Sequence, residues 1–177
     1  MSSCGVADPA SPAAGWRPLR PCDLPGLERI AEIVHPAYPE RAEIPAERLA
    51  LFAPGCFAAW SGPEMVGYAV SHPGRLGDPP ALDTLLGTLP AAPDCLYLHD
   101  VALLPAARGA GLGSALIARL VALAAARDLL ALALVAVGTS ARYWAAHGFR
   151  PPPDPPAGLS AKLASYGDAA AYLVRRL

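Results

Sequence analysis

Residues 97–118 read Tyr-Leu-His-Asp-Val-Ala-Leu-Leu-Pro-Ala-Ala-Arg-Gly-Ala-Gly-Leu-Gly-Ser-Ala-Leu-Ile-Ala. An apolar, strand-like run ends at Pro105, and a helix pattern begins after a short turn. That turn contains one arginine and three glycines: Arg108, Gly109, Gly111 and Gly113. The N–H groups of such a turn and of the first helical turn lack internal partners, and the helix dipole there favours negative charge. Glycine permits positive φ and close approach of a bulky group. The stretch therefore predicts a site for a phosphorylated ligand.

The spacing of the glycines narrows the choice of ligand. A P-loop ends in Gly-Lys-Ser/Thr, whereas this loop ends Gly113-Ser114 without a lysine, which argues against a nucleotide triphosphatase. A dinucleotide fingerprint needs Gly-x-Gly-x-x-Gly. The sixth position from Gly109 is Ser114, and the sixth from Gly111 is a leucine. The nearest acidic residue, Asp128, closes the helix instead of following a second strand. A nicotinamide-dependent oxidoreductase remains an alternative, to be tested with NAD(P).

The composition describes a globular chain of 177 residues with a formal net charge of −1, which shows no basic footprint for nucleic acid. Hydrophobic residues make up 54% of the sequence. The most apolar region, residues 112–137, is interrupted by Arg119, Arg127 and Asp128, so no run is long enough for a membrane-spanning helix. We expect a soluble, cytoplasmic protein with no membrane association.

The N-terminal residues have neither the basic start nor the apolar core of a signal peptide. We expect residues 1–14 to be a disordered lead and residues 15–177 to form a single domain of sizeable core. The four cysteines stand far apart, without a Cys-x-x-Cys pair, at Cys4, Cys22, Cys56 and Cys95. This spacing argues against a metal site, and we expect free thiols.

Apolar periodicity predicts a mixed α/β order of elements. Strands are expected at residues 15–19, 56–60, 65–71, 97–104, 129–137, from 149, and at 169–176. Helices are expected between Asp23 and His35, at 45–52, at 114–127 and from Ser140 to His147, with one or two helical turns at 82–86. The continuous apolar run 129–137 predicts a buried strand parallel to the strand at 97–104.

Two segments carry a family resemblance. Arg108-x-x-Gly111-x-Gly113 resembles motif A of the GCN5-related N-acetyltransferases (GNAT), in which the turn holds the pyrophosphate of acetyl-coenzyme A. The segment Ala-Arg-Tyr-Trp-Ala-Ala-His-Gly-Phe at 141–149 resembles the later signature of that family. The resemblance is specific from about residue 96 to 150. It implies a GNAT-like mixed, mostly antiparallel central sheet flanked by helices, with a parallel strand pair at the cofactor site.

The resemblance also implies a donor site for acetyl-CoA, with no metal. The residues expected to hold the pyrophosphate are Arg108, Gly109, Ala110, Gly111, Leu112, Gly113 and Ser114. The carbonyl oxygen of the acetyl group would meet the backbone of Val101, Ala102 and Leu103, where the fourth strand of the family bulges away from the fifth. Arg142 either touches a phosphate or belongs to a solvated helix face. Trp144 is expected to pack along the pantetheine arm.

Acetyl transfer to an amine needs a proton acceptor, because an alkylammonium has a pKa near 10.4. His99 is the best candidate base, since imidazole titrates near neutrality. Measured back from Arg108, it lies where the resembling arylalkylamine N-acetyltransferases carry a histidine. Period two places Tyr97, His99 and Val101 on one face, and Asp100 on the other. Asp100 is the rival base; it either takes protons or pairs with a neighbour, and His99 could be merely hydrogen-bonded in the sheet.

Departure of the thiolate raises a further question. The family often has a tyrosine four residues before the Gly-Phe glycine, but that position is Trp144, and Tyr143 is one step earlier. Tyr143 is the candidate acid if the helix is rotated. Otherwise the thiolate leaves unaided, which a thiol pKa near 8.5 allows. The family also has an asparagine seven residues before that tyrosine, and in this sequence the position is occupied by Val137.

The acceptor would be recognised by four residues between the first two helices and by the loop at 75–94. The four residues are His35, Tyr38, Glu40 and Glu43. Their carboxylates suit a cationic amine, although charges in a loop are commonly just solvated. We expect a small-molecule or peptide amine as acceptor, attacked directly in a ternary complex, and a homodimer as the candidate assembly. The alternative is a non-catalytic acyl-CoA sensor, favoured by Trp144.

Overall fold

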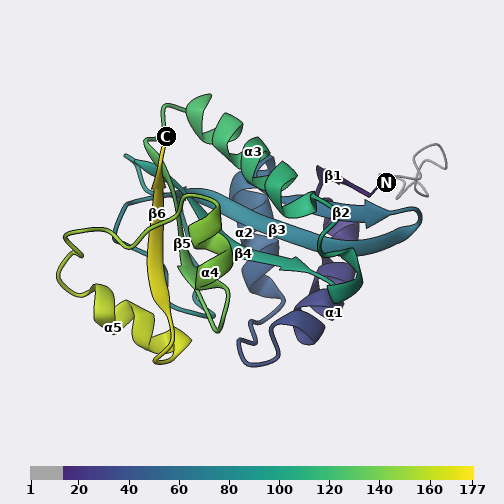
Figure 1. Ribbon diagram of the computed structural model, residues 1–177, viewed down its shortest axis with the longest axis horizontal. Helices are drawn as coiled ribbons and strands as arrows, with labels where there is room; N and C mark the ends of the chain where they lie inside the picture. Colours follow the sequence, from purple (N-terminus) through teal and green to yellow (C-terminus); the bar gives the residue numbers. More distant parts are fainter. Residues whose placement is uncertain (1–13) are drawn as a thin grey trace.

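A six-stranded sheet is the framework of the computed structural model, which describes residues 14–177 (Figure 1). The strands lie in chain order: β1 (Gly15–Pro18), β2 (Phe57–Ser61), β3 (Glu64–Gly74), β4 (Cys95–Leu103), β5 (Ala131–Ala136) and β6 (Ala171–Arg176). All neighbouring pairs are antiparallel except β4 and β5, which are parallel. This confirms the predicted mixed sheet with one parallel strand pair. The predicted lead at 1–14 lies, apart from Ala14, outside the described residues.

Helices cover both faces of the sheet (Figure 1). On one face lie α1 (Leu24–Val34) and α2 (Glu43–Phe52), and on the other lie α3 (Leu112–Ala125) and α4 (Ala141–Ala146). The short helix α5 (Leu159–Leu163) packs beside β6, on the face opposite α3. Short 3₁₀ turns occupy Pro21–Asp23, Ala53–Gly55, Pro105–Ala107 and Ala164–Tyr166. None of the helices within residues 14–177 combines the length and the apolar character needed to cross a bilayer.

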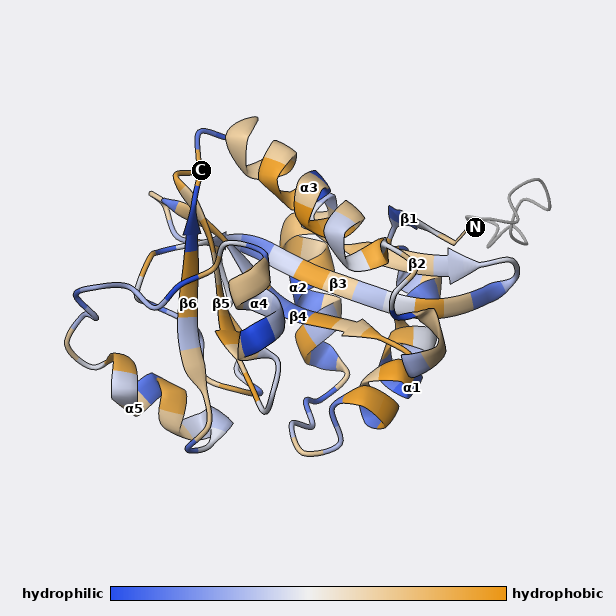
Figure 2. Cartoon of the chain, in the orientation of Figure 1, coloured by the Kyte–Doolittle hydropathy of each residue, from blue (hydrophilic) through white to orange (hydrophobic). Residues whose placement is uncertain are grey.

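The parallel strand β5 is buried on both faces, which explains its continuous apolar sequence. Leu132 and Leu134 pack under α3, and Ala131 and Ala133 pack on the opposite side near Leu159. Figure 2 shows β5 hydrophobic along its length, whereas the C-terminal end of β6 is hydrophilic. The core on the α3 side therefore holds the parallel pair in place, and with it the loop between β4 and α3.

The pairing of β4 with β3 shifts register at His99. Val70 pairs with Asp100, and the next residue, Ser71, pairs with Leu98. His99 is thus left without a direct partner in β3, which is the arrangement of a β-bulge. Two consecutive residues, His99 and Asp100, can then present their side chains to the same side of the sheet.

The bulge overturns the predicted alternation along β4. Before it, Leu98 packs in the core under α3 while Tyr97 packs on the opposite face. After it, Val101 and Leu103 pack under α3 and Ala102 packs on the α1 side. Val101 therefore does not share a face with Tyr97, because one extra residue reverses the phase of every residue that follows.

Two local predictions are wrong, and one short helix was not predicted. No strand starts at 149: Arg150 makes an isolated bridge to Val174, and prolines follow that cannot donate to a ladder. Residues 82–86 are not helical: Leu82 and Asp83 form a turn, with Asp83 at φ 55°, and residues 84–86 have no regular secondary structure. The short helix α5 was not predicted; packing of its Leu159 against Tyr97 and Tyr172 stabilises it more than its local sequence does.

The cysteines differ from one another in state. Cys56 and Cys95 are free and buried, and burial raises the pKa of Cys56 to about 11 and that of Cys95 to about 12. Both are therefore protonated, unreactive core residues. Cys22 is disulfide-bonded, so the expectation of free thiols is wrong for this residue. Spacing along the chain does not determine which thiols approach each other in space.

Candidate active site

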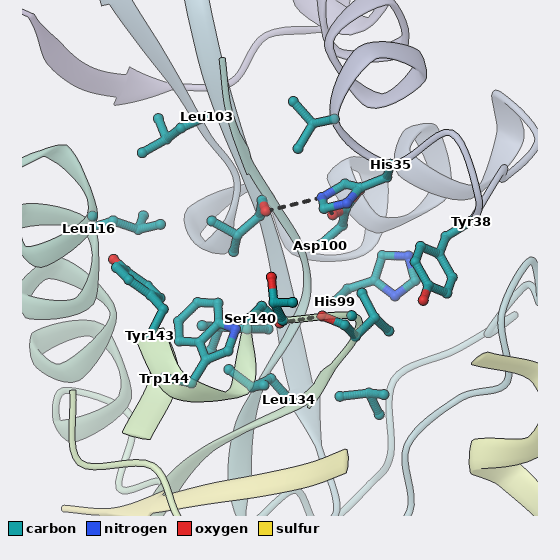
Figure 3. Close-up of a pocket in the computed structure, with 18 of the residues that line it drawn as sticks. His35, Tyr38, His99, Asp100, Leu103, Leu116, Leu134, Ser140, Tyr143 and Trp144 are labelled. Atoms are coloured by element: carbon teal, nitrogen blue, oxygen red, sulfur yellow. Dashed lines mark hydrogen bonds and ion pairs between the residues drawn. The ribbon is translucent and has the colours of Figure 1, made fainter. Parts of the chain in front are cut away.

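A cleft opens where β4 and β5 separate. Their parallel pairing ends at Leu98 and Leu134, although β4 continues to Leu103. The cleft has a volume of about 600 Å³. In Figure 3, Tyr143 and Trp144 lie on one side of it, and His35, Tyr38 and His99 lie on the other. Beyond Leu98, the N–H groups on this edge of β4 have no partner in β5.

The glycine-rich loop borders the cleft at the start of α3. Gly109 has φ 82°, and Gly111, which precedes the helix as its N-cap, has φ 80°. A Cβ at either position would meet no atom within 4 Å. The backbone conformation therefore requires glycine, and the space beside it is open to a ligand. Arg108 lines the cleft, and its Nε donates to the carbonyl of Leu103 at 3.1 Å. The loop fits a phosphorylated ligand.

Gly113 leaves room for an aromatic side chain. A Cβ at this position would overlap the hydroxyl of Tyr143, so the tyrosine ring packs directly on the first turn of α3. Tyr143 also contacts Trp144, with ring centroids 5.1 Å apart, and His147, at 4.4 Å. Its side chain is 43% exposed, yet partial burial raises its pKa. The phenol thus carries its proton at neutral pH and lies beside the glycine-rich loop.

Trp144 is buried in the cleft wall. Its ring packs edge-on against Phe149, with centroids 5.3 Å apart. Arg142, by contrast, is exposed on α4 and does not line the cleft. Ala110 and Ser114 are exposed residues of the loop, and Ser114 Oγ lies 3.3 Å from His147 Nε2.

His99 and Glu40 form a close pair beneath the cleft. Glu40 Oε2 lies 2.9 Å from His99 Nε2, and the two residues are 59 positions apart in the sequence. The His99 side chain is 2% exposed, whereas that of Glu40 is 14% exposed. Both residues line the cleft. The bulge at His99 therefore directs its ring toward the segment between α1 and α2.

The hydrogen bond to Glu40 determines the tautomer of His99. An ionised carboxylate can only accept, so Nε2 carries the hydrogen and a neutral ring keeps its lone pair on Nδ1. Nδ1 is buried and has no hydrogen-bond partner among residues 14–177. The ring thus has the arrangement of a base held by a carboxylate through one nitrogen, with the other nitrogen free to accept a proton.

Asp100 forms a second pair with His35. Its Oδ1 lies 3.2 Å from His35 Nε2, and its Oδ2 accepts the hydroxyl of Tyr68 at 2.5 Å. Burial opposes ionisation of Asp100, but the bonds from His35 and Tyr68 outweigh it and lower the pKa. Burial likewise opposes the positive charge on His35, but the hydrogen bond and the negative charge of Asp100 outweigh the effect of burial, so the pKa of the His35 ring is raised. Asp100 is therefore a stable carboxylate and a weak base.

A second groove, of about 400 Å³, runs along α1 and meets the cleft. The two cavities share five lining residues: His35, Tyr38, Glu40, His99 and Asp100. Both histidine–carboxylate pairs consequently stand where the cleft and the groove join. Two ligands entering from opposite sides would meet at these pairs.

Comparison with known proteins agrees with this geometry. The sequence model of the acetyltransferase (GNAT) family matches residues 27–149. The chain belongs to this family. No curated protein sequence matches it. Among the solved structures that share the fold of this GNAT protein is the loading GNATL domain of CurA from Lyngbya majuscula, with 15% sequence identity and a TM-score of 0.72 over 92% of this chain and 97% of that one. The GNAT-like decarboxylase GphF in complex with isobutyryl-CoA has 20% identity and a TM-score of 0.67 over 91% of this chain and 98% of that one. Naa50 from Arabidopsis thaliana in complex with the bisubstrate analogue CoA-Ac-MVNAL has 14% identity and a TM-score of 0.63 over 92% of this chain and 97% of that one.

The loop at 75–94 of this GNAT protein is tied to α2 and to the segment before it. Glu40 Oε1 accepts the N–H of Asp83 at 3.0 Å, and Arg41 contacts the Asp83 carboxylate at 2.9 Å. Glu47 accepts the N–H groups of Leu86 and Gly87, each at 2.8 Å. Glu40 is therefore held from one side by the loop while it contacts His99 on the other. The sequence named Glu40 for substrate contact, but nothing in it indicated its pairing with His99.

Two further buried polar residues of the GNAT fold escaped the sequence reasoning. Arg48 is 0% exposed; it donates to the carbonyl of Thr84 at 2.6 Å and pairs with Glu47. His72 lies beside His99, with ring centroids 6.2 Å apart, and its Nδ1 is 2.9 Å from the carbonyl of Pro73. Arg48 Nε and His72 Nε2 have no hydrogen-bond partner among the described residues. Burial lowers the pKa of His72 to about 4, so this ring is neutral. The only sequence signal was a polar residue within an apolar pattern.

Proposed function

We propose that this GNAT protein is an N-acetyltransferase that transfers an acetyl group from acetyl-CoA to an amine in a ternary complex. The observation that carries the proposal is the junction of the cleft and the groove at the His99–Glu40 pair. The cleft adjoins the glycine-rich loop and suits the donor. The groove opens on the other side of the same pair and suits the acceptor.

The donor would be held by the loop and the first turn of α3. The free N–H groups there, the open space at Gly109 and Gly111, and Arg108 support binding of the pyrophosphate. The pantetheine arm would then follow the separation of β4 and β5, past Trp144. Backbone N–H groups between Val101 and Leu103 would meet the acetyl carbonyl oxygen, since β4 is unpaired on this edge.

His99 would receive the proton of the acceptor ammonium. Glu40 fixes the hydrogen on Nε2 and stabilises the imidazolium, so Nδ1 accepts the proton directly or through one water molecule. The neutral amine attacks the carbonyl carbon, the C–N bond forms and the C–S bond breaks. The second amine proton passes to water as the amide forms, and it replaces the proton that the departing sulfur takes up. His99 then returns the first proton to solvent, so that one proton is released overall. Asp100, held ionised by His35, would attract the cationic acceptor to this junction before the acceptor gives its proton to His99.

Tyr143 is the proposed donor of the proton that the sulfur takes up. Its raised pKa keeps the phenol protonated, as an acid requires. Its hydroxyl lies on Gly113 at the edge of the cleft. Because a thiol is a good leaving group, the help that Tyr143 supplies would be smaller than that from His99.

The second candidate function is a non-catalytic acyl-CoA sensor. The observation in its favour is that Trp144 occupies the usual tyrosine position, with its ring packed on Phe149. Such a protein would keep the loop and lose the acid. The solved GNAT-like decarboxylase shows in addition that this fold is compatible with other reactions.

An assay of free thiol release from acetyl-CoA separates the two functions. The full chain is incubated with acetyl-CoA and a panel of alkylamines, diamines, arylalkylamines, amino acids and short peptides, while calorimetry measures coenzyme affinity. Amine-dependent thiol release, with a mass increase of the amine by one acetyl group, supports the enzyme. Tight coenzyme binding without turnover on any amine contradicts it and favours the sensor.

A further inference from the structure

The groove along α1 is strongly acidic. Four carboxylates line it, from Glu28, Glu32, Glu40 and Asp100, and no lysine or arginine does so. The remaining lining includes the apolar side chains of Leu27, Ala31, Pro45 and Val70. A ligand that fits this surface carries positive charge and an apolar backbone between its charges.

The four carboxylates fall into two groups. Glu40 and Asp100, at the junction with the cleft, each pair with a histidine. Glu28 and Glu32, further along the groove, form no ion pair within 4 Å to any residue of 14–177. They are four residues apart on α1, where like charges repel each other by a few tenths of a kcal/mol. A cation between them would relieve this repulsion.

A second observation also points to a hydrogen-bond donor as ligand. His99 lines the same groove, its side chain is 2% exposed, and its Nδ1 has no partner among the described residues. Since Glu40 holds the hydrogen on Nε2, Nδ1 is an acceptor. Its complement is an N–H group, such as that of an ammonium ion.

The spacing of the groups sets the length of the ligand. With a rise of about 1.5 Å per residue, Glu32 lies roughly 4.5 Å and Glu28 roughly 10.5 Å from His35 along the axis of α1. His35 lines the same junction of cleft and groove as the His99–Glu40 pair. Measured from His35, a second cationic nitrogen beside Glu32 and Glu28 would lie ~5–10 Å along the groove. The apolar residues between the two nitrogens suit a chain of methylene groups.

We propose, on the basis of the proposed acetyltransferase function, that the acceptor is an α,ω-diamine or linear polyamine. One nitrogen reacts at His99 and the other stays cationic between Glu28 and Glu32. These two carboxylates are then specificity-determining residues that do not touch the reacting atoms. A basic peptide would present related charges, and the test below separates it from a small amine.

The test compares 1,5-diaminopentane with pentylamine, which lacks only the second charge. In the wild-type protein we expect kcat/KM for the diamine to be roughly five- to tenfold higher than that for pentylamine, the effect of two partly exposed charge pairs. This ratio of the two kcat/KM values should shrink with added NaCl, because salt screens the charges. In Glu28→Gln/Glu32→Gln the ratio should fall to near one. The matched control, Asp154→Asn/Asp168→Asn, removes two exposed carboxylates outside the groove and should keep the wild-type ratio.

The outcomes are distinct. Acetylation of both amines with equal kcat/KM overturns the inference while the acetyltransferase function stands. Acetyl-CoA binding without acetylation of any amine overturns both. A higher kcat/KM for a lysine-containing peptide than for the diamine, lost in Glu28→Gln/Glu32→Gln, overturns the assignment to a small amine and makes a basic peptide the acceptor.

Discussion

His99 in the bulge of β4 and Glu40 in the segment between α1 and α2 are joined by a contact of 2.9 Å between Nε2 and Oε2. Glu40 is in turn held by the N–H of Asp83 in the loop at 75–94. Three segments far apart in the sequence thus meet at one imidazole. The orientation of the proposed base depends on all of them.

His99→Ala should lower kcat by roughly 10²- to 10⁴-fold and change the pH profile of kcat/KM, because the proposed base is lost. Glu40→Gln should lower kcat less and keep an ionisation, since the imidazole remains but loses the carboxylate that stabilises its charge. Steady-state kinetics between pH 5.5 and 9.5 measure both. An unchanged pH profile in His99→Ala would rule out His99 as the base.

Gly111→Val should abolish coenzyme A binding. A β-branched side chain at φ 80° costs about 1–3 kcal/mol of backbone strain and occupies the open space beside the loop. Titration calorimetry with coenzyme A checks the affinity, and circular dichroism checks that the fold persists. Gly15→Ala is the control, because a Cβ there meets no atom within 4 Å and the residue lies in β1, away from the loop. Retained affinity in Gly111→Val would refute the loop as the phosphate site.

Tyr143→Phe should lower kcat by roughly tenfold, with little change in the affinity for coenzyme A, if the phenol protonates the departing sulfur. The ring contacts with Trp144 and His147 are kept in this variant, so the fold should not change. Single-turnover measurements of thiol release give the rate of the chemical step. Wild-type turnover would mean that the thiolate leaves without this residue.

His72 should make folding stability depend on pH. Burial lowers its pKa to about 4, whereas the unfolded value is near 6.5, so the unfolded chain binds more protons between these values. Stability should therefore fall as the pH drops through this window, by up to about 3 kcal/mol from this ring. His72→Asn should flatten the dependence measured by urea unfolding at pH 4.5 to 7.5.

His35 acts in the opposite direction in the same experiment. Its raised pKa contributes stability that is present below pH 6.5 and is lost as the pH rises through the folded value. Because the wild type and His72→Asn share His35, its effect cancels in their difference. Parallel stability curves for the two proteins would contradict the assignment of a neutral His72.

The sequence by itself determined the strand, turn and helix of the proposed donor side. The strand, the glycine-rich turn and the helix at residues 97–118 are contiguous, and local chemistry decides their conformation: Gly109 and Gly111 adopt positive φ, and the apolar run before Ala136 forms the parallel partner strand. The family resemblance rests on the same residues. Such features are predictable because they need few contacts with distant parts of the chain.

Only the tertiary structure decided the arrangement of the proposed acceptor side. The bulge at His99 depends on the register between β3 and β4, and it reversed the predicted faces of Val101 and Asp100. The pairs of His99 with Glu40 and of His35 with Asp100 join residues 59 and 65 positions apart. No local pattern encodes such contacts, because they form only when α1 packs on the sheet and the loop at 75–94 is tied to Glu40 and Glu47. The proposed base, His99, could be chosen from its residue type. Its partner, its tautomer and the acidic groove beside it follow from packing.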